Sequence, residues 1–148
     1  MTRDEKELLF KDLSARLPYH VRCKVWLKYG TTEEGPLDLQ HNYDDVLRAA
    51  FFYNEIKDIK PYLRPMSSMT EEEFESLKEY SGLKYDQLDL ASYQNGTYKC
   101  LDFYLSEVPS YVVILVFDWL NQHHFDYRGL IEKGLAIEVT ENNNPYKD

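Results

Sequence analysis

The N-terminal segment carries apolar residues at the spacing of an amphipathic helix. Thr2 and Glu5 form a capping box, in which each side chain can bind the backbone amide of the other residue. Pro18 disfavours a helical conformation of the residue before it, so we expect the helix to end at Leu17. The stripe that faces the core is predicted from five positions: Leu8, Leu9, Phe10, Leu13 and Leu17.

Residues 20–29 alternate between two kinds of side chain, which predicts a half-buried β-strand. One face carries Val21, Cys23, Val25, Leu27 and Tyr29. The other face carries His20, Arg22, Lys24, Trp26 and Lys28. Gly30–Gly35 is predicted as a polar turn, and a returning strand is expected to carry Leu37, Leu39 and His41.

The middle of the chain joins an extended segment to a well-marked helix. Ile59–Pro65 is predicted to be extended, because residues that precede a proline avoid the helical region. Thr70 and Glu73 form a second capping box, and the glutamates of this first turn suit the helix dipole. The helix is expected to end at Gly82. Met69 and Phe74 occupy the positions of a hydrophobic staple, and Phe74 and Leu77 are expected to face inward.

Two segments are ambiguous between helix and strand. Val46–Tyr53 combines helical spacing with a β-prone FFY, and we favour a short helix that leads into a strand. Tyr111–Phe117 suits a strand by composition, but we favour a helix over Tyr111–Gln122 with Ser110 as its cap and Asp118 on its wetter side.

Turn signals divide the remaining segments. Asn95-Gly96 predicts a type I′ hairpin. Gly129 and Gly134 are expected to bracket one helical turn, Leu130–Lys133, before an edge strand at Ala136–Val139. Asn142–Asp148 is predicted to be a frayed polar tail.

These elements predict one α+β domain over residues 1–148. Its small antiparallel sheet would be built from the two hairpins and covered by the N-terminal, middle and C-terminal helices. No repeat, linker or low-complexity tract divides the chain.

Composition limits the classes of partner. The formal net charge is −9, and acidic residues are concentrated between Thr70 and Glu107. Such a surface repels phosphate, so direct nucleic-acid binding is disfavoured and a protein partner is expected. Thirteen tyrosines against seven phenylalanines suit contact surfaces, because tyrosine has an apolar body and a polar tip.

The chain is expected to be cytoplasmic and to have no membrane span. The N-terminus lacks the apolar stretch of a secretory signal, and the longest apolar run, Tyr111–Phe117, is far shorter than the ~20 residues a span requires. Cys23 and Cys100 lie in apolar or strand-like contexts and are expected to be buried free thiols.

Asp118–Ala136 contains the side chains of this chain that most resemble a catalytic or metal site: two adjacent histidines, an aspartate and an arginine. His123 and His124 are adjacent, so on a helix they point about 100° apart and cannot bind one metal together. We therefore favour a structural interpretation, in which histidine and Arg128 bind the last carbonyls of a helix and Asp126 caps the following turn. The candidate polar cluster is His123, His124, Asp126, Tyr127 and Arg128.

A second candidate surface is the extended joint around Tyr62 and Arg64, where basic side chains would offset Glu71–Glu73 or contact a partner. Motifs for a catalytic nucleophile, a phosphate-binding loop or a dinucleotide site are absent from the sequence. We therefore expect no cofactor, no metal and no catalytic residue.

Three sequence segments are similar to those of a known protein family: EKELLFKDLSARLPY, IKPYLRPMSSMTEEE and DWLNQHHFDYRGLIEKGLAIE. They resemble a family of small uncharacterised proteins of Bacteroides-type gut bacteria and of their phages and mobile elements. The resemblance covers about a third of the chain, and the Asn142–Asn144 ending departs from it. It implies a bacterial or phage cytoplasmic setting and no particular activity.

Three functional hypotheses follow. The first is a non-enzymatic interaction or accessory protein, which the tyrosine-rich acidic composition and the lack of catalytic motifs favour. The second is an acidic inhibitor that mimics nucleic acid on a host defence protein. The third is a small hydrolase or nuclease that uses His123, His124 or Asp126.

Overall fold

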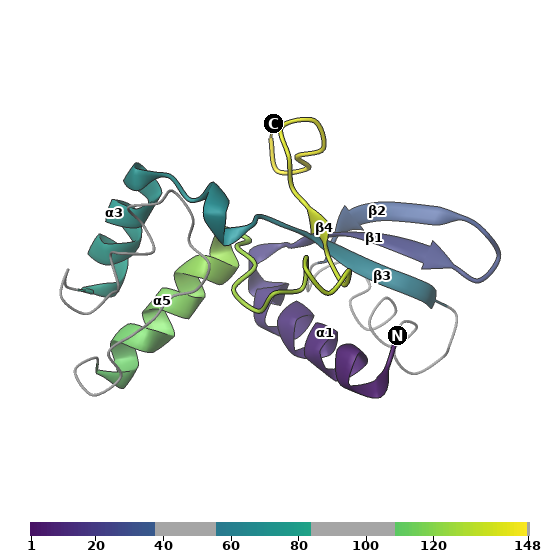
Figure 1. The fold of residues 1–148 in the computed structure, drawn as a ribbon, viewed down its shortest axis with the longest axis horizontal. Coiled ribbons are helices and arrows are strands. Elements are labelled where there is room, and N and C mark those ends of the chain that lie inside the picture. The colour runs from purple at the N-terminus through teal and green to yellow at the C-terminus, as the bar shows by residue number, and fades with distance from the viewer. Residues whose placement is uncertain (38–55, 84–108, 148) are drawn as a thin grey trace. The chain divides into compact units, whose positions relative to one another are not determined.

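The computed structural model describes residues 1–37, 56–83 and 109–147, and its first element is the helix α1 (Arg3–Arg16) (Figure 1). The predicted capping box is confirmed, because Thr2 and Glu5 each bind the other's backbone amide. A 3-10 turn, η1 (Leu17–Tyr19), follows at Pro18. Phe10 departs from the expected stripe and is 40% exposed, since the buried face is centred on Leu9 and Leu13 instead.

The strands form one sheet in the order β2-β1-β3-β4. β1 (Arg22–Leu27) pairs antiparallel with β2 (Thr32–Pro36) and with β3 (Ile56–Leu63), whereas β4 (Ile137–Glu138) runs parallel to β3. A strand within residues 20–29, the extended Ile59–Pro65 and the edge strand near Ile137 are therefore confirmed. The first of these is shorter than predicted, because it ends at Leu27 and Tyr29 is 92% exposed, and the sheet is mixed.

The first hairpin turns earlier than the sequence predicts. Gly30 adopts a left-handed φ of 87° and its amide donates to the carbonyl of Leu27, so the turn is complete by Thr31. Thr32–Pro36, most of which was expected to be turn, is the returning strand because its backbone continues the ladder with β1. Leu37 is buried just beyond it, and the expected positions of Leu39 and His41 lie outside the described residues.

α1 lies along one face of this sheet (Figure 1). The core between them collects side chains from the helix, the strands and the C-terminal segment. Its buried members include Leu9, Leu13, Leu17, Val21, Cys23, Ile59, Leu63, Leu130 and Leu135. We call this part, Met1–Leu63 with Arg128–Asp148, the sheet unit.

Residues Arg64–Tyr127 form a second compact unit, here called the helical unit. Its helix α3 (Glu71–Ser81) begins at the predicted Thr70–Glu73 capping box and ends at Gly82, which has a left-handed φ of 73°. A 3-10 turn, η2 (Met66–Ser68), precedes α3. Met69, Phe74 and Leu77 are buried, which confirms the predicted staple and inward face.

α5 (Ser110–Gln122) confirms the helical alternative for Tyr111–Gln122. Ser110 is not its cap; it is the first helical residue, because Pro109 keeps an extended backbone and its carbonyl accepts from the amides of Val112 and Val113. α5 packs beside α3 (Figure 1) in a core that includes Met66, Met69, Phe74, Leu77, Val112, Val116, Trp119 and Phe125.

The C-terminal segment is anchored and is not the frayed tail that its polar composition predicts. The Tyr146 hydroxyl accepts from the Arg22 amide at 3.1 Å and donates to the Tyr62 carbonyl at 2.7 Å. Asn143 also binds Thr140 and the Glu138 carbonyl. The tail is held because one half-buried tyrosine occupies a gap at the end of the β1–β3 ladder.

The α+β class is confirmed, with helices at the N-terminus, in the middle and in the C-terminal part of the chain. α1 packs on the sheet, whereas α3 and α5 share a separate core. The single-domain prediction stays a prediction. The Asn95-Gly96 hairpin and Val46–Tyr53 lie outside the described residues.

Candidate functional site

The predicted polar cluster begins at the end of α5. The Nδ1 of His123 lies 2.8 Å from the carbonyl of Trp119, which can only accept, so this nitrogen carries the proton. The imidazole also stacks on the Trp119 ring, with centroids 3.8 Å apart. His123 therefore binds a terminal helix carbonyl, as the structural interpretation of this segment predicts.

His124 has a left-handed backbone, with φ of 60°, and this residue ends the helix. Its amide donates to the carbonyl of Asn121, and its own carbonyl accepts from the amide of Arg64 at 2.8 Å. The Asp126 amide in turn donates to the carbonyl of Arg64, also at 2.8 Å. Arg64 and Phe125 thus form a short parallel bridge, which joins two segments about 60 residues apart in sequence.

The Arg64 guanidinium makes three hydrogen bonds within the helical unit. It donates to both carboxylate oxygens of Glu73, at 2.7 and 2.8 Å, and to the carbonyl of Ser68. Its planar group also lies 4.2 Å from the centroid of the Phe125 ring. The expected pairing of Arg64 with Glu71–Glu73 is confirmed at Glu73, and its geometry is typical of a rigid structural pair.

Glu73 is held as an anion. Burial alone would raise its pKa, but the hydrogen bonds from Arg64 and from the backbone of Thr70 outweigh burial, so the pKa lies below its ordinary value. A carboxylate in this state does not provide a proton near neutral pH. This geometry assigns Glu73 to capping and pairing instead of general acid catalysis.

The remaining members of the cluster diverge. Tyr127 donates to the side chain of Asn121 at 2.9 Å and packs against Phe117. Asp126 is 8% exposed. In the sheet unit, the Arg128 Nε lies 3.4 Å from the Asp12 carboxylate, and its expected binding to the last carbonyls of α5 stays a prediction.

Tyr62 is also buried instead of lying on a contact surface. It is 8% exposed and its hydroxyl donates to Glu34, which also pairs with Lys24 at 2.9 Å. Burial and the bond to Glu34 raise the pKa of the Tyr62 phenol. Lys60 lies near Asp58 and the Trp26 ring, both in the sheet unit, and its expected offset of Glu71–Glu73 stays a prediction.

Sequence reasoning missed a buried ion pair in α1. Arg16 donates to both oxygens of Asp12, at 2.7 and 3.1 Å, and neither side chain is exposed. The signal was their i, i+4 spacing on the face of Leu9 and Leu13. Cys23 is buried beside this pair, and burial raises the pKa of its thiol.

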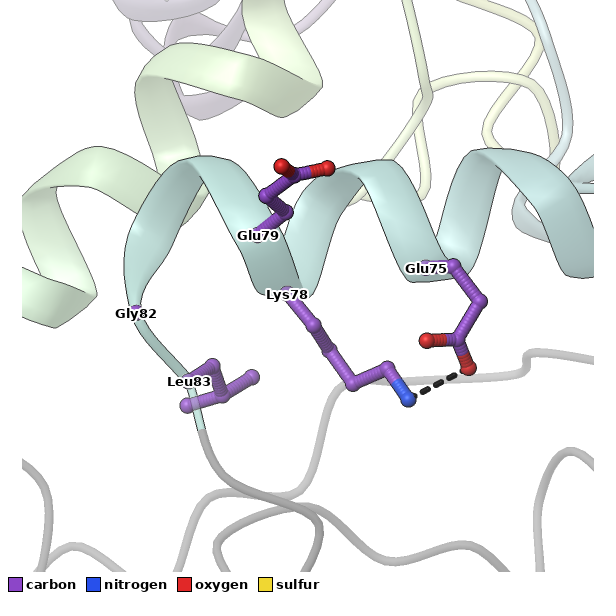
Figure 2. A pocket seen from close by; sticks show the side chains of 5 residues that line it. All are labelled: Glu75, Lys78, Glu79, Gly82 and Leu83. Atoms are coloured by element: carbon purple, nitrogen blue, oxygen red, sulfur yellow. Dashed lines mark hydrogen bonds and ion pairs between the residues drawn. The ribbon is translucent and has the colours of Figure 1, made fainter.

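The solvent-facing side of α3 is acidic. Two shallow pockets lie along it, the first lined by Thr70, Glu71, Glu72 and Glu75. Figure 2 shows the second, where Lys78 reaches from the helix to Glu75 and Glu79 lies on another side. Lys78 is 6% exposed and also lies over the Phe74 ring at 4.9 Å. These pockets suit cationic groups better than anionic ones.

α5 exposes apolar side chains on the face opposite its core. Tyr111 is 66% exposed and Ile114 is 60% exposed, while Leu115 and Asp118 are half-buried on the same side. Their spacing of i, i+3, i+4 and i+7 places them in one row. We call Tyr111, Ile114, Leu115 and Asp118 the α5 stripe.

The described residues carry neither a metal-ligand cluster nor a membrane-spanning helix. They contain no group of three or more metal-ligating side chains, and none of their helices has the length and apolar composition needed to cross a bilayer.

Comparison with protein-family models, curated proteins and solved structures gave no match. The family resemblance therefore stays an expectation. The candidate site that the described residues favour is a binding surface of the helical unit, formed by the α5 stripe and the acidic side of α3.

Proposed function

We propose that the chain is a non-enzymatic accessory protein that binds another protein through its helical unit. The observation that carries this proposal is the exposure of Tyr111 and Ile114 on a helix whose other face is already packed. Adjacent exposed apolar side chains favour association, because burying them in a contact removes unfavourable hydration. Tyr80 on α3, 48% exposed, adds a further aromatic contact group.

The hydrogen bonds of three polar residues of the helical unit also support a binding role over catalysis. His123, Arg64 and Glu73 are each held by nearby groups of the helical unit. A general acid or base needs a proton-transfer atom that faces substrate, and these contacts serve the backbone and an ion pair. The proposal includes a cytoplasmic setting in a bacterium, phage or mobile element, which rests on the sequence resemblance.

A photocrosslinking amino acid at position 114 tests the proposal in lysate of a Bacteroides-type bacterium. We expect one dominant protein adduct, identified by mass spectrometry, which weakens in the Tyr111→Ser background. The same crosslinker at Glu132, an exposed residue of the sheet unit, is the matched control. Equal adducts from both positions would contradict the proposal.

A second candidate function is an acidic inhibitor that occupies a nucleic-acid-binding groove. Glu71, Glu75 and Glu79 are exposed at i, i+4 and i+8, with Glu72 beside them. A rise of 1.5 Å per residue spaces these three helix positions about 6 Å apart along the axis, and the middle one, Glu75, is paired with Lys78. We call these three residues the α3 row.

This candidate is tested by the salt dependence of binding to the crosslinked partner. Affinity should fall steeply between 50 and 200 mM salt, and Glu71→Gln, Glu75→Gln and Glu79→Gln together should flatten that dependence. The matched control replaces three exposed carboxylates of the sheet unit, Glu132, Glu138 and Glu141, by glutamine. Binding that is insensitive to salt would exclude an electrostatic mimic.

A further inference from the structure

We infer that the partner surface recognised by the α5 stripe is a basic amphipathic helix. This inference rests on the proposed function and adds the chemistry of the partner. It draws on two independent features of the helical unit: the spacing of the exposed apolar side chains, and the excess of carboxylates over available cations.

The first feature is geometric. Tyr111, Ile114 and Leu115 make a continuous apolar row about one helical turn long, and Asp118 extends it by a further turn. Rows at i, i+3, i+4 and i+7 are the surfaces on which a second helix packs, with its side chains between those of the first. A flat or irregular partner would bury less of the apolar area of this row than a helix would.

The second feature is electrostatic. The described part of the helical unit has two lysine or arginine side chains, and both are already held: Arg64 by Glu73, and Lys78 by Glu75 and the Phe74 ring. No ion pair to Asp118 is present among the described residues, and α5 offers no lysine or arginine one turn away. The described acidic residues of this unit are Glu71, Glu72, Glu73, Glu75, Glu79, Asp118 and Asp126.

A cation from the partner therefore complements Asp118 at the end of the apolar row. The same carboxylates repel the phosphates of nucleic acids and of anionic lipid surfaces. An amphipathic helix fits both the apolar row and the acidic charge. It would place leucine-like residues on Tyr111 and Ile114 and a lysine or arginine beside Asp118.

A defined peptide tests this chemistry on the full-length protein. The probe is a fluorescent 18-residue helix with leucine at i, i+3, i+4 and i+7 positions and lysine elsewhere. We expect saturable binding at physiological salt, measured by anisotropy. A scrambled peptide of the same composition, and a peptide with glutamate in place of lysine, should bind at least about tenfold more weakly.

Two substitutions locate the contact. Ile114→Ser should weaken binding of the leucine–lysine peptide about fivefold or more, since Ile114 supplies exposed apolar area. Asp118→Asn should weaken it about threefold. The matched control Glu72→Gln also removes one negative charge, but from the exposed side of α3, and should leave the affinity for the peptide unchanged. Circular dichroism and denaturant unfolding establish that each variant is folded.

Each other result overturns the inference. A Glu72→Gln effect equal to that of Asp118→Asn, or equal binding of the scrambled peptide, would show general attraction to acidic surface. Self-association in solution that Ile114→Ser abolishes would make a second copy of the chain the occupant. Flotation of the wild-type protein, but not Ile114→Ser, with anionic vesicles would make it a lipid surface.

The inference and the proposed function fail separately. A specific protein adduct at position 114, together with no preference for the leucine–lysine peptide, keeps the proposed function and rejects the basic helix. Specific peptide binding at the α5 stripe without any adduct in lysate keeps the surface chemistry and rejects the proposed cellular role.

Discussion

Asp12 and Arg16 lie one turn apart on α1, and neither side chain is exposed to solvent. Taking both charges out of water is costly, and their two hydrogen bonds, with Arg128 3.4 Å away, offset that cost. Near the surface of the same helix, Glu7 and Lys11 repeat the i, i+4 spacing with side chains that are 59% and 62% exposed. The two pairs share one sequence spacing, but they differ in burial and are therefore expected to contribute differently to the free energy of unfolding.

Asp12→Ala is predicted to destabilise the protein by about 3–5 kcal/mol, because it removes the carboxylate that compensates a buried guanidinium. Glu7→Ala removes the exposed pair and is predicted to cost less than about 0.5 kcal/mol. Urea unfolding of both variants measures the difference. Equal losses of stability would contradict the assignment of Asp12 as a buried charge partner.

The Glu73 carboxylate gives a pH prediction. Its folded-state pKa is below the ordinary value of 4.5, so its contribution to stability is complete above about pH 4.5 and is lost as pH falls through the folded pKa. The stability difference between wild type and Glu73→Gln should therefore shrink as pH falls below about 4.5. Unfolding curves at several pH values measure it, with Glu72→Gln as an exposed control. A constant difference would contradict the pairing with Arg64.

At the scale of elements, the turn at Leu130–Gly134 is defined by two backbone hydrogen bonds and a left-handed glycine. The Leu135 amide donates to the Leu130 carbonyl, the Gly134 amide donates to the Ile131 carbonyl, and Gly134 has a left-handed φ of 70°. This is a Schellman arrangement, which ends a turn and directs the chain into β4. The expected single turn between Gly129 and Gly134 is therefore present: the Lys133 amide donates to the Gly129 carbonyl at 3.4 Å before the chain reverses.

Gly134→Ala is predicted to cost about 1 kcal/mol, because a side chain at positive φ is strained. Gly35→Ala is the matched control: Gly35 lies in β2 with no positive φ, and an added Cβ meets nothing within 4 Å. It should be neutral or slightly stabilising. Thermal unfolding compares the two, and equal effects would contradict the left-handed conformation of Gly134.

At the scale of the whole molecule, contacts distant in sequence complete each unit. In the sheet unit, Tyr146 reaches Arg22 and Tyr62 across 124 and 84 positions of sequence. In the helical unit, the backbone of Arg64 binds on both sides of Phe125. Neither pairing has a local cause, since each depends on how the chain folds back on itself.

Tyr146→Phe is predicted to destabilise the protein by about 1–3 kcal/mol, because the amide of Arg22 and the carbonyl of Tyr62 lose their bridging hydroxyl. Tyr29→Phe is the control, since Tyr29 is 92% exposed and should have almost no effect. Hydrogen exchange should also speed up at the Arg22 amide in Tyr146→Phe. Unchanged exchange there would contradict the bridge.

The single-domain prediction can be tested through the core of the helical unit. Leu77 is fully buried, so Leu77→Ala should cost about 2–5 kcal/mol. If residues 1–148 unfold as one cooperative domain, the amides of α1 should lose hydrogen-exchange protection by the same free energy. Unchanged protection in α1 would show that the two units unfold independently.

Local signals determined a large part of this fold. Capping boxes at Thr2 and Thr70, the left-handed end at Gly82 and the alternation of β1 were predictable, because each depends on residues within a few positions. The helical end of the polar cluster was also predictable, since His123 binds a carbonyl one turn before it. The α5 stripe, however, needed the structure, because YVVILVF alone does not show which apolar face stays exposed.

The sequence by itself therefore determined the capped ends of α1 and α3, the alternation within β1 and the acidic character of the chain. Only the tertiary structure decided that Tyr62 is buried, that Arg128 binds Asp12, that Tyr146 anchors the tail and that β4 joins in parallel. The physical reason is range: caps and periodicity act over one or two turns, whereas burial and long-range pairing depend on which distant segments share a core.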